Sequence, residues 1–335
     1  MKKVLFFGYY GEGNLGDELL LKNLIDKFSE RFLVGALVSK KKETENKIIL
    51  FDRIRELLKA INWADVVIGG GGGIFQDKTS LHSFLYYLFI LWYALLTKKK
   101  VYIIGQSFSP LKYRISRYLL KITLPHCGKI YVRDSFSYQF LQNLNVPKDK
   151  IKILPDIVFL TQFPDVRRDK ENIGINFRPW DELKIEDLEK ILKELLKENR
   201  KIIFFSFQDS MDLELFKKLD KEMIKEIEVV SSNSDNFWEK FSTCKYLVGM
   251  RLHSLILSTI AGIPFLGISY DEKIQAYLDD LGWKYYINTN EISDFYPLWI
   301  KLKEEEEILR SYLKIITEEK RDILKREIEE FIESL

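Results

Sequence analysis

The stretch VLFFGYYGEGNLGDELL, residues 4–20, decides the fold class of this chain of 335 residues. Its four apolar residues 4–7 predict a short buried strand, and Gly11, Gly13 and Gly16 then match the spacing G-x-G-x-x-G. The leucines that follow recur among polar residues as they do in a helix. Strand, glycine-rich loop and helix in this order are typical of a Rossmann-like sheet, in which the helix N-terminus offers N–H groups to a ligand.

The same loop lacks the features of a dinucleotide site. A nicotinamide-binding domain carries an acidic residue about 20 residues further on, at the end of the second strand. Here that strand runs into Ser39 and three lysines (40–42), which suit only a 2′-phosphate. Asp17 and Glu18 disfavour a bound pyrophosphate, but they complement the helix dipole and can hold sugar hydroxyls. We therefore expect a polyhydroxyl ligand here, held by Gly11, Asn14, Gly16 and Asp17.

Strand-like and helix-like segments alternate along most of the chain, which predicts parallel sheets covered by helices on both faces. The first array has expected strands at 4–9, 32–38, 65–68, 101–105 and 129–132, with helices at 17–28, 53–61, 80–96, 113–124 and 135–144. The pattern stops at 154–172, where two prolines and a charged run indicate a linker. A second array follows, with strands at 173–177, 201–207, 227–231, 246–250 and 264–269 and helices at 185–198, 213–224 and 252–261.

The expected fold class is α/β, with two Rossmann-like domains facing a cleft at the carboxyl ends of their strands. We expect the N-terminal domain over residues 1–160 and the C-terminal domain over residues 172–300. From residue 303 onward, apolar residues recur at helical spacing among many charges. The last segment, 301–335, is therefore predicted to be an amphipathic helical tail that packs back on the domains.

A run of five glycines, residues 69–73, follows the expected strand 65–68. Glycine is entropically costly in regular structure and gives no side-chain packing, so the run favours a bare backbone surface that lines a site. Close packing of a helix on the sheet is the alternative. The residues that follow the run include Gln76 and Asp77, which suit hydroxyl groups. We expect this loop to contact the ligand through Gly71, Gly72, Gln76 and Asp77.

Cations follow three strands of the second array. Arg178 comes directly after the strand 173–177, and Lys273 comes shortly after the strand 264–269. Arg251 and His253 stand two residues apart where a strand becomes a helix, so an extended backbone would point both the same way. A surface arginine and a core histidine are the structural alternatives. His82 and His126 lack such a setting and are expected to be structural.

Composition excludes several classes of protein. With 52 Lys and Arg against 50 Asp and Glu, the net charge is only +2, so a nucleic-acid-binding protein is not expected. The two cysteines lack metal or disulfide spacing and agree with a reducing cytoplasm. The longest apolar run, 84–96, is too short to span a bilayer, which takes about 20 residues. Two interpretations of this run stay open: a buried crossover helix, or a helix that rests on a membrane surface.

These blocks, in this order, resemble the polysaccharide pyruvyl transferase family, and in particular its bacterial cell-wall branch. The resemblance covers roughly residues 3–290 and rests on seven blocks: 8–18, 69–77, 105–106, 133–134, 178–180, 249–254 and 269–273. The chain departs from the family after Gln106, where Ser107, Phe108, Ser109 and Pro110 replace a more glycine-rich stretch.

The resemblance implies a two-Rossmann architecture similar to that of GT-B glycosyltransferases. It implies phosphoenolpyruvate as donor and a glycan sugar as acceptor, N-acetylmannosamine in the cell-wall branch, with a cyclic pyruvate ketal as product. The implied donor-site and catalytic residues are Arg178, Arg251 and His253, with Ser254 and Lys273 beside them. Such a reaction needs no metal and no cofactor.

The remaining expectations concern the acceptor, its carrier and the rival functions. Asp17 is the candidate for orienting or deprotonating the acceptor hydroxyl. The acceptor could be lipid-linked, in which case a cytoplasmic enzyme would work at the inner face of the membrane. No feature of the sequence indicates an oligomeric state. A glycosyltransferase with a nucleotide-sugar donor and a non-catalytic glycan-binding protein are the two rival functions.

Overall fold

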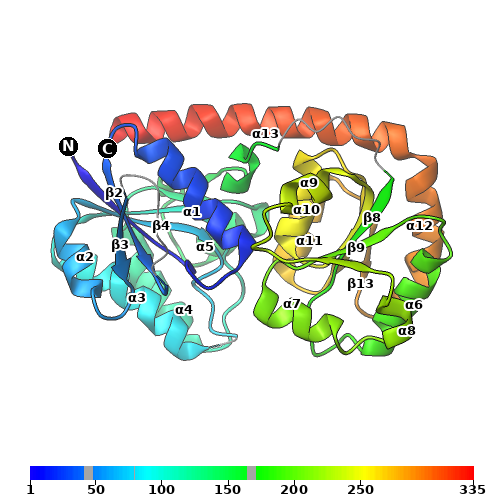
Figure 1. The fold of residues 1–335 in the computed structure, drawn as a ribbon. Coiled ribbons are helices and arrows are strands. Elements are labelled where there is room, and N and C mark those ends of the chain that lie inside the picture. The colour runs from blue at the N-terminus through cyan, green and yellow to red at the C-terminus, as the bar shows by residue number, and fades with distance from the viewer. Residues whose placement is uncertain (41–47, 79, 164–170) are drawn as a thin grey trace. The chain divides into compact units, whose positions relative to one another are not determined.

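The computed structural model describes residues 1–40, 48–78, 80–163 and 171–335. Lys41 and Lys42 of the lysine run, and residues 164–170 of the expected linker, lie outside the described residues. The chain divides into two compact units (Figure 1). Unit 1 consists of Met1–Glu12, Gly16–Leu160 and Ile323–Leu335, and unit 2 consists of Gly13–Leu15 and Thr161–Asp322.

Unit 1 is built on a parallel sheet of seven strands in the order β3-β2-β1-β4-β5-β6-β7. The strands are β1 (Lys3–Phe7), β2 (Leu33–Val38), β3 (Ile48–Asp52), β4 (Val66–Gly72), β5 (Lys100–Gln106), β6 (Ile130–Val132) and β7 (Ile151–Ile153). The order reverses between β1 and β4, which are neighbours in the sheet and register Phe6 opposite Ile68. In such sheets ligands bind outside the carboxyl ends of the strands where the order reverses.

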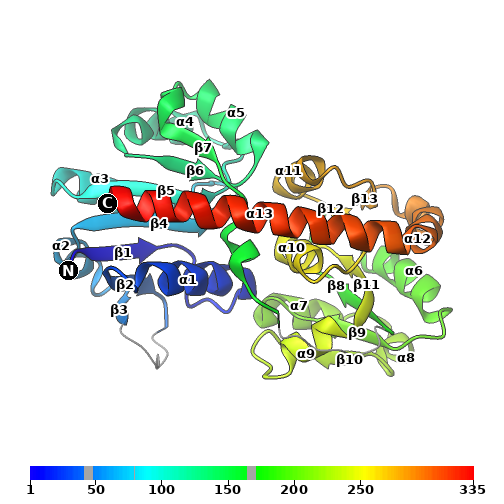
Figure 2. The same cartoon turned by 90° about the horizontal axis from the view of Figure 1, so that it is seen from above.

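Helices cover both faces of this sheet (Figure 2). They are α1 (Leu15–Phe28), α2 (Leu57–Trp63), α3 (Leu81–Leu96), α4 (Arg114–Thr123) and α5 (Ser135–Asn143), with short 3₁₀ turns η1 (Leu124–His126), η2 (Lys148–Lys150) and η3 (Ile157–Leu160). Two helix starts carry the expected side-chain caps. Ser80 accepts the Ser83 N–H at 3.2 Å, and Asp134 accepts the Ser137 N–H at 2.6 Å.

Unit 2 repeats the plan with six parallel strands in the order β10-β9-β8-β11-β12-β13. They are β8 (Asn172–Asn176), β9 (Ile202–Phe205), β10 (Glu228–Val230), β11 (Cys244–Gly249), β12 (Phe265–Ser269) and β13 (Tyr286–Asn288). Its helices are α6 (Ile185–Leu196), α7 (Asp209–Phe216), α8 (Lys221–Ile224), α9 (Phe237–Ser242), α10 (Leu252–Ile260), α11 (Glu272–Leu281) and α12 (Phe295–Glu304), with a 3₁₀ turn η4 (Ile292–Asp294) before α12.

The helix α13 (Glu306–Ser334) contributes residues to both units. Its last part packs against unit 1, where the Phe331 ring lies 5.0 Å from that of Tyr102 and 5.4 Å from that of Tyr131, centroid to centroid. Phe28 of α1 contacts the same ring. Lys152 of β7 pairs with Glu327. These residues, 323–335, therefore form part of the core of unit 1.

The expected two α/β arrays and helical tail are confirmed, but three strands were not predicted. These are β3, β7 and β13, all on sheet edges and none longer than five residues. Short edge strands need little apolar sequence because only one neighbour pairs with them, so they give a weak periodic signal. Strand β4 is also longer than expected, since it continues through Gly72.

Close packing explains four of the five glycines of the run. A Cβ atom on Gly69 would lie 2.9 Å from the Phe7 ring, and one on Gly70 would lie 2.7 Å from Leu24 of α1. One on Gly71 would lie 2.6 Å from Leu20 of α1. Gly71 and Gly72 also have φ of +80° and +81°, a backbone conformation that residues with a side chain rarely adopt. The packing that was the alternative explanation thus accounts for residues 69–72.

We expect Gly71→Ala to destabilise unit 1 by about 1–3 kcal/mol, because alanine is strained at positive φ and its methyl group would displace Leu20. The matched control is Gly73→Ala, because Gly73 is exposed and its nearest neighbour would lie 3.8 Å from the new Cβ. Urea unfolding followed by circular dichroism measures both. Equal stability of the two variants would contradict this explanation of the glycine run.

Candidate active site

The strand order of unit 2 reverses between β8 and β11, so their carboxyl ends mark the expected ligand-binding edge. Three of the predicted residues lie there. Arg178 follows β8, and Arg251 and His253 follow β11. The structure therefore brings the candidate donor residues to one edge of one sheet.

Arg178 lies among aromatic rings. Its guanidinium is 5.0 Å from the Tyr270 ring centroid and 5.7 Å from that of Trp180, and the two rings are 4.5 Å apart. Its Nη1 donates to the Tyr270 hydroxyl at 2.8 Å. Among the described residues, the buried Nε atom of Arg178 and the buried Nε1 atom of Trp180 have no hydrogen-bond acceptor. Buried N–H groups are normally satisfied, so two of them in neighbouring residues indicate a place for an acceptor group of a ligand.

Arg251 is held in place by a buried ion pair. Its Nε atom lies 2.8 Å and 3.0 Å from the two carboxylate oxygens of Asp212 in α7. The Arg251 side chain is 7% exposed and that of Asp212 is 0% exposed. The guanidinium charge is thus already balanced within the protein, which leaves it less attraction for an anionic ligand than an unpaired arginine would have.

Asn176, the last residue of β8, connects the strand ends around this ion pair. Its side-chain oxygen accepts the Arg251 N–H at 3.0 Å, and its side-chain nitrogen donates to the Phe205 carbonyl of β9 at 2.9 Å. The carboxylate of Asp212 accepts the N–H groups of Phe207 and Gln208, at 2.9 Å and 3.1 Å. These bonds fix the ends of β8, β9 and β11 relative to one another.

His253 lies in the first turn of α10, for which Arg251 is the N-cap, and it is 9% exposed. The expectation that Arg251 and His253 point the same way along an extended backbone was wrong, because the helix already begins at Leu252. The Ser254 hydroxyl, expected at the donor, is fully buried and donates to the Arg251 carbonyl at 2.7 Å. Lys273 stands in the first turn of α11 and lies 3.6 Å from the carboxylate of Asp271.

In unit 1 the candidate acceptor residues gather where α1 meets β4. Gly11 has φ of +79°, and its N–H donates to Glu18 at 2.8 Å. Gly16 and Asp17 stand buried in the first turn of α1. An Asp17 oxygen lies 2.8 Å from the position that a Cβ atom on Gly72 would occupy, so the structure brings this carboxylate onto the end of β4.

The phenol of Tyr10 also lies near the end of β4, where it was not predicted from the sequence. Its hydroxyl donates to the Gly70 carbonyl. Burial raises the pKa of the Tyr10 phenol well above its usual value, and the nearby Asp17 carboxylate raises it further. The phenol therefore stays protonated and remains a hydrogen-bond donor.

Asp77 has a structural partner. Its carboxylate accepts the N–H groups of Lys112 and Tyr113 at 2.6 Å and 3.0 Å, directly before α4. Burial alone would raise the pKa of Asp77, but the hydrogen bonds that the carboxylate accepts hold it below its usual value. Gln76 is half-buried on the same loop. The acceptor contact expected of Asp77 would compete with these two backbone hydrogen bonds.

A buried polar network supports the glycine loop of unit 1. The Gln106 amide donates to the Gly71 carbonyl and accepts the Ile74 N–H. Beside it, Arg133 pairs with Asp156 at 2.8 Å, and its Nε donates to the Ser107 hydroxyl at 2.6 Å. Ser107, where the chain departs from the resembled family, thus has a defined role. The blocks 105–106 and 133–134 hold the loop rather than line it.

Asn14, expected beside Gly11 and Gly16, belongs with unit 2, because Gly13–Leu15 are part of that unit. There Asn14 forms an isolated antiparallel bridge with Gln208, and the Leu15 N–H donates to the Phe207 carbonyl at 2.8 Å. Gln208 immediately precedes α7, the helix that carries Asp212. Asn14 thus follows the glycine-rich loop in sequence and is bonded to Gln208 at the start of α7.

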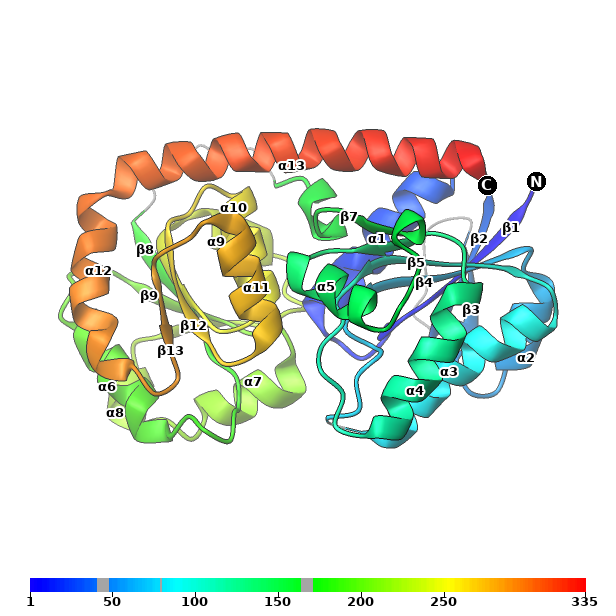
Figure 3. The same ribbon diagram turned by 180° about the vertical axis from the view of Figure 1, so that it is seen from behind.

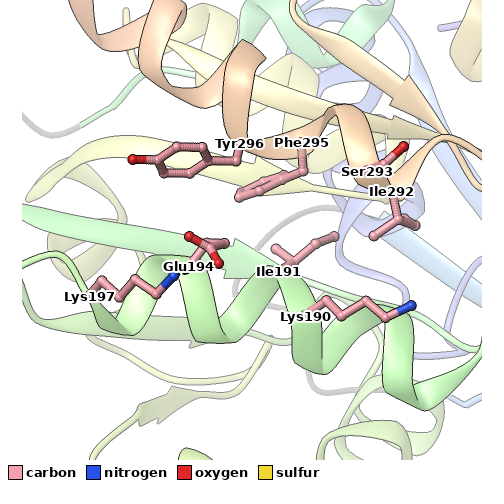
Figure 4. A pocket seen from close by; sticks show the side chains of 8 residues that line it. All are labelled: Lys190, Ile191, Glu194, Lys197, Ile292, Ser293, Phe295 and Tyr296. Atoms are coloured by element: carbon pink, nitrogen blue, oxygen red, sulfur yellow. Dashed lines mark hydrogen bonds and ion pairs between the residues drawn. The ribbon is translucent and has the colours of Figure 1, made fainter.

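A pocket of about 560 Å³ in unit 2 lies between α6 and the residues that lead into α12 (Figure 4). Its two lysine ammonium groups are paired with acidic residues of α6 itself, Lys190 with Asp187 and Lys197 with Glu194. None of the predicted site residues lines it. The strand edge, rather than this pocket, remains the candidate active site.

Three supporting residues, Asn176, Asp212 and Tyr270, were not assigned a role from the sequence. Tyr270 lies within a resembled block and could have been found by its place after β12. Asn176 ends a strand, but its side chain looks like any polar strand residue until the neighbouring strands are placed. Asp212 lies 39 positions from its partner, and no local pattern joins the two.

Comparison with solved structures defines the fold class as that of two Rossmann-like units of the GT-B type. The Anabaena protein HepE, solved in complex with UDP-glucose, aligns over 100% of both chains with a TM-score of 0.65 and 11% identity. S. aureus MnaA, solved with UDP, aligns over 94% of this chain and 91% of its own with a TM-score of 0.66 and 11% identity. The UDP-GlcNAc 2-epimerase of Neisseria meningitidis, bound to UDP-GlcNAc, covers 100% of both chains with a TM-score of 0.61 and 12% identity.

The sequence itself matches the family described as polysaccharide pyruvyl transferase over residues 14–272, which is more than half of the chain. The chain therefore belongs to this family. It is a transferase of polysaccharide biosynthesis, and a glycan acceptor follows from the family. Among the described residues, no helix is both long and apolar enough to cross a membrane.

We expect Asp212→Asn to lower the stability of unit 2 by about 3–5 kcal/mol, because it leaves the buried Arg251 charge without its partner. The control is Glu214→Gln on the same helix, whose side chain is 63% exposed and which should change stability by less than about 1 kcal/mol. Calorimetric unfolding of both variants measures the difference. A loss no larger for Asp212→Asn than for Glu214→Gln would mean that the ion pair does not hold the strand ends.

Proposed function

We propose that the chain transfers the pyruvyl group of phosphoenolpyruvate onto two hydroxyl groups of a glycan sugar, with release of phosphate. The proposed sugar is an N-acetylmannosamine of a cell-wall polymer, and the product is a cyclic ketal. Family membership supports the reaction class. The structural observation that carries the choice of donor is the pair of buried N–H groups, Arg178 Nε and Trp180 Nε1, that lack acceptors beside a guanidinium.

Phosphoenolpyruvate carries a carboxylate and a phosphate, and both suit the edge of unit 2. The planar guanidinium of Arg178 can bind either group in bidentate fashion, with Tyr270 and Trp180 holding its plane. The first turn of α10 adds backbone N–H groups and the positive end of a helix dipole. In this proposal Arg251 orients that turn and adds positive charge near the donor, while its ion pair with Asp212 limits its direct contact. Ser254 and Lys273 stand beside these groups.

The chemistry requires an acid for the donor and a base for the acceptor. His253 protonates C3 of phosphoenolpyruvate, which generates an oxocarbenium-like centre at C2. One sugar hydroxyl attacks C2, the C2–O bond to phosphate breaks, and a second hydroxyl closes the ring. Of the two hydroxyl protons, one restores the acid and the other leaves with the phosphate. The sum of reactants and products is balanced, and no oxidant or reductant takes part.

The acceptor is proposed to bind the loops of unit 1. Asp17, in the first turn of α1 with its carboxylate beside Gly72 at the end of β4, can accept a hydrogen bond from a sugar hydroxyl and is the candidate base. Gly11, Gly16 and Gly71 shape the backbone around it. The proposal also includes Asn14, Gln76 and Asp77, of which Asp77 would have to add a sugar contact to its hydrogen bonds with the backbone before α4. A lipid-linked sugar and a cytoplasmic site at the inner membrane face complete the proposal.

Donor binding tests this proposal against its main rival. Calorimetric titration of the whole chain should detect phosphoenolpyruvate and not a UDP-sugar, and incubation with a lipid-linked disaccharide should release phosphate with a matching gain in mass. Titration heat from the UDP-sugar alone would instead establish a nucleotide-sugar transferase. The rival has a basis, since HepE and MnaA were solved with UDP-glucose and UDP. Binding of glycan without turnover would indicate the non-catalytic function.

We expect His253→Ala to lower turnover by about 10² or more while donor affinity changes only a few-fold, as the loss of a general acid does. His126→Ala, at an exposed histidine of unit 1, serves as the control and should retain full turnover. Phosphate release at saturating donor is the measurement. Undiminished turnover of His253→Ala would remove this residue from the mechanism.

We expect Arg178→Ala to weaken phosphoenolpyruvate binding by about tenfold to a hundredfold, the value of a charge-assisted hydrogen bond. Arg178→Lys should recover only part of this affinity, because an ammonium group lacks the planar fork. Lys218→Ala, at an exposed lysine of unit 2, controls for the loss of one positive charge. If calorimetry gives the same affinity for Arg178→Ala as for the unaltered chain, Arg178 does not belong to the donor site.

A further inference from the structure

The positive charges of the chain are unevenly distributed. Between Asp77 and Asp134 the sequence contains ten Lys and Arg residues and no Asp or Glu. Because the whole chain has 52 basic against 50 acidic residues, the rest of the chain is net negative. This segment includes α3 and α4, which lie side by side in unit 1 (Figure 3). This segment therefore concentrates positive charge in a chain that is almost neutral overall.

Helix α4 exposes three large apolar side chains, although it also buries Leu120. Ile115 is 55% exposed, Tyr118 is 58% exposed and Ile122 is 43% exposed, at positions i, i+3 and i+7 of one helix face. The buried side of the same helix consists of Leu120 and two polar residues, Ser116 and Thr123. A helix that served only the core of unit 1 would be expected to present polar residues at the three exposed apolar positions.

Cations flank this apolar face. Arg114, Arg117 and Lys121 are exposed at the same i, i+3 and i+7 spacing, and Lys112 precedes the helix. None of the four forms an ion pair with another described residue. The carboxylate at the start of α4, that of Asp77, is buried and bound to backbone N–H groups.

Helix α3 extends the apolar surface. Leu85 is 42%, Phe89 43% and Leu96 80% exposed. Their spacing places them on one helix face together with Trp92, whose indole N–H donates to Thr123 of α4 at 2.7 Å. The exposed face of α3 thus adjoins α4. Of the two interpretations left open for residues 84–96, burial is confirmed for one side of the helix, which carries Phe84, Leu88 and Leu91. Contact of the other side with a membrane stays a prediction.

We propose that this α3–α4 surface, defined by Leu85, Phe89, Leu96, Lys112, Arg114, Ile115, Arg117, Tyr118, Lys121 and Ile122, docks unit 1 on an anionic lipid bilayer. Exposed apolar and aromatic side chains insert at the headgroup level, and the surrounding cations bind lipid phosphates. Charge complementarity favours this occupant, since an anionic bilayer offers phosphates to the four cations and acyl chains to the apolar face beside them. The functional reason for docking rests on the proposed lipid-linked acceptor. The evidence for the surface itself does not depend on which reaction the protein catalyses.

Vesicle sedimentation tests the surface without any substrate. The whole chain should bind vesicles that contain about a third phosphatidylglycerol at least tenfold more tightly than vesicles of phosphatidylcholine alone, and added salt should weaken the binding. Arg117→Glu with Lys121→Glu should weaken binding to the anionic vesicles by about tenfold or more. Tyr118→Ser with Ile122→Ser should also weaken it, although the net charge is unchanged.

The matched control is Lys218→Glu with Lys225→Glu in unit 2, which makes the same change in net charge at exposed positions. It should retain vesicle binding. Circular dichroism separates loss of binding from loss of fold, and Arg117→Gln with Lys121→Gln provides a milder pair if the glutamates disturb the helix. The vesicle assay contains neither donor nor acceptor, so it does not depend on the reaction. Phosphate release can therefore succeed where vesicle binding fails, and vesicle binding can succeed where phosphate release fails.

Three results would overturn the proposal. The first is an unaltered chain that does not bind anionic vesicles at low salt. The second is a control pair that loses as much binding as Arg117→Glu with Lys121→Glu, which would make the effect one of total charge. The third is a dimer in solution that becomes a monomer in Tyr118→Ser with Ile122→Ser, without vesicle binding, which would assign the surface to a second copy of the chain.

Discussion

The ion pair between Arg251 and Asp212 is the contact on which the candidate donor site depends. Either charge alone would be too costly to bury, so neither residue could hold its place without the other. Asp212 also binds the two N–H groups that follow β9, and Asn176 binds the backbone of Arg251 from the end of β8. The starts of α7 and α10 are thereby fixed, and with them the position of His253.

Unit 1 solves the same physical problem with different residues. Strands of a parallel sheet end in loops that must stay rigid near a ligand although little apolar surface is available to pack them. Gln106 binds the backbone of the glycine loop on both sides of Gly72, and the buried pair of Arg133 with Asp156 lies beside it. In both units, therefore, charged or amide side chains are buried for the sake of loop geometry.

The sequence was sufficient for the features that depend on local pattern. The two arrays, the tail and the glycine loops follow from apolar periodicity and from residues such as Gly11 and Gly16, whose spacing has a mechanical meaning. It was insufficient where a residue acquires its role from a distant partner. Nothing in the sequence indicated that Asp77 bonds to the backbone before α4, because those bonds span 35 positions, or that Arg251 pairs with Asp212, which lies in α7.

Helix α13 gives the chain an unusual order of completion. Residues up to Leu160 provide every strand of the unit 1 sheet, but Phe331, which packs on Phe28, Tyr102 and Tyr131, is synthesised only after all of unit 2. During translation those aromatic rings therefore remain without their covering side chain for as long as the ribosome needs to make about 170 further residues after Leu160. The first half of the protein to emerge is thus the last to be finished.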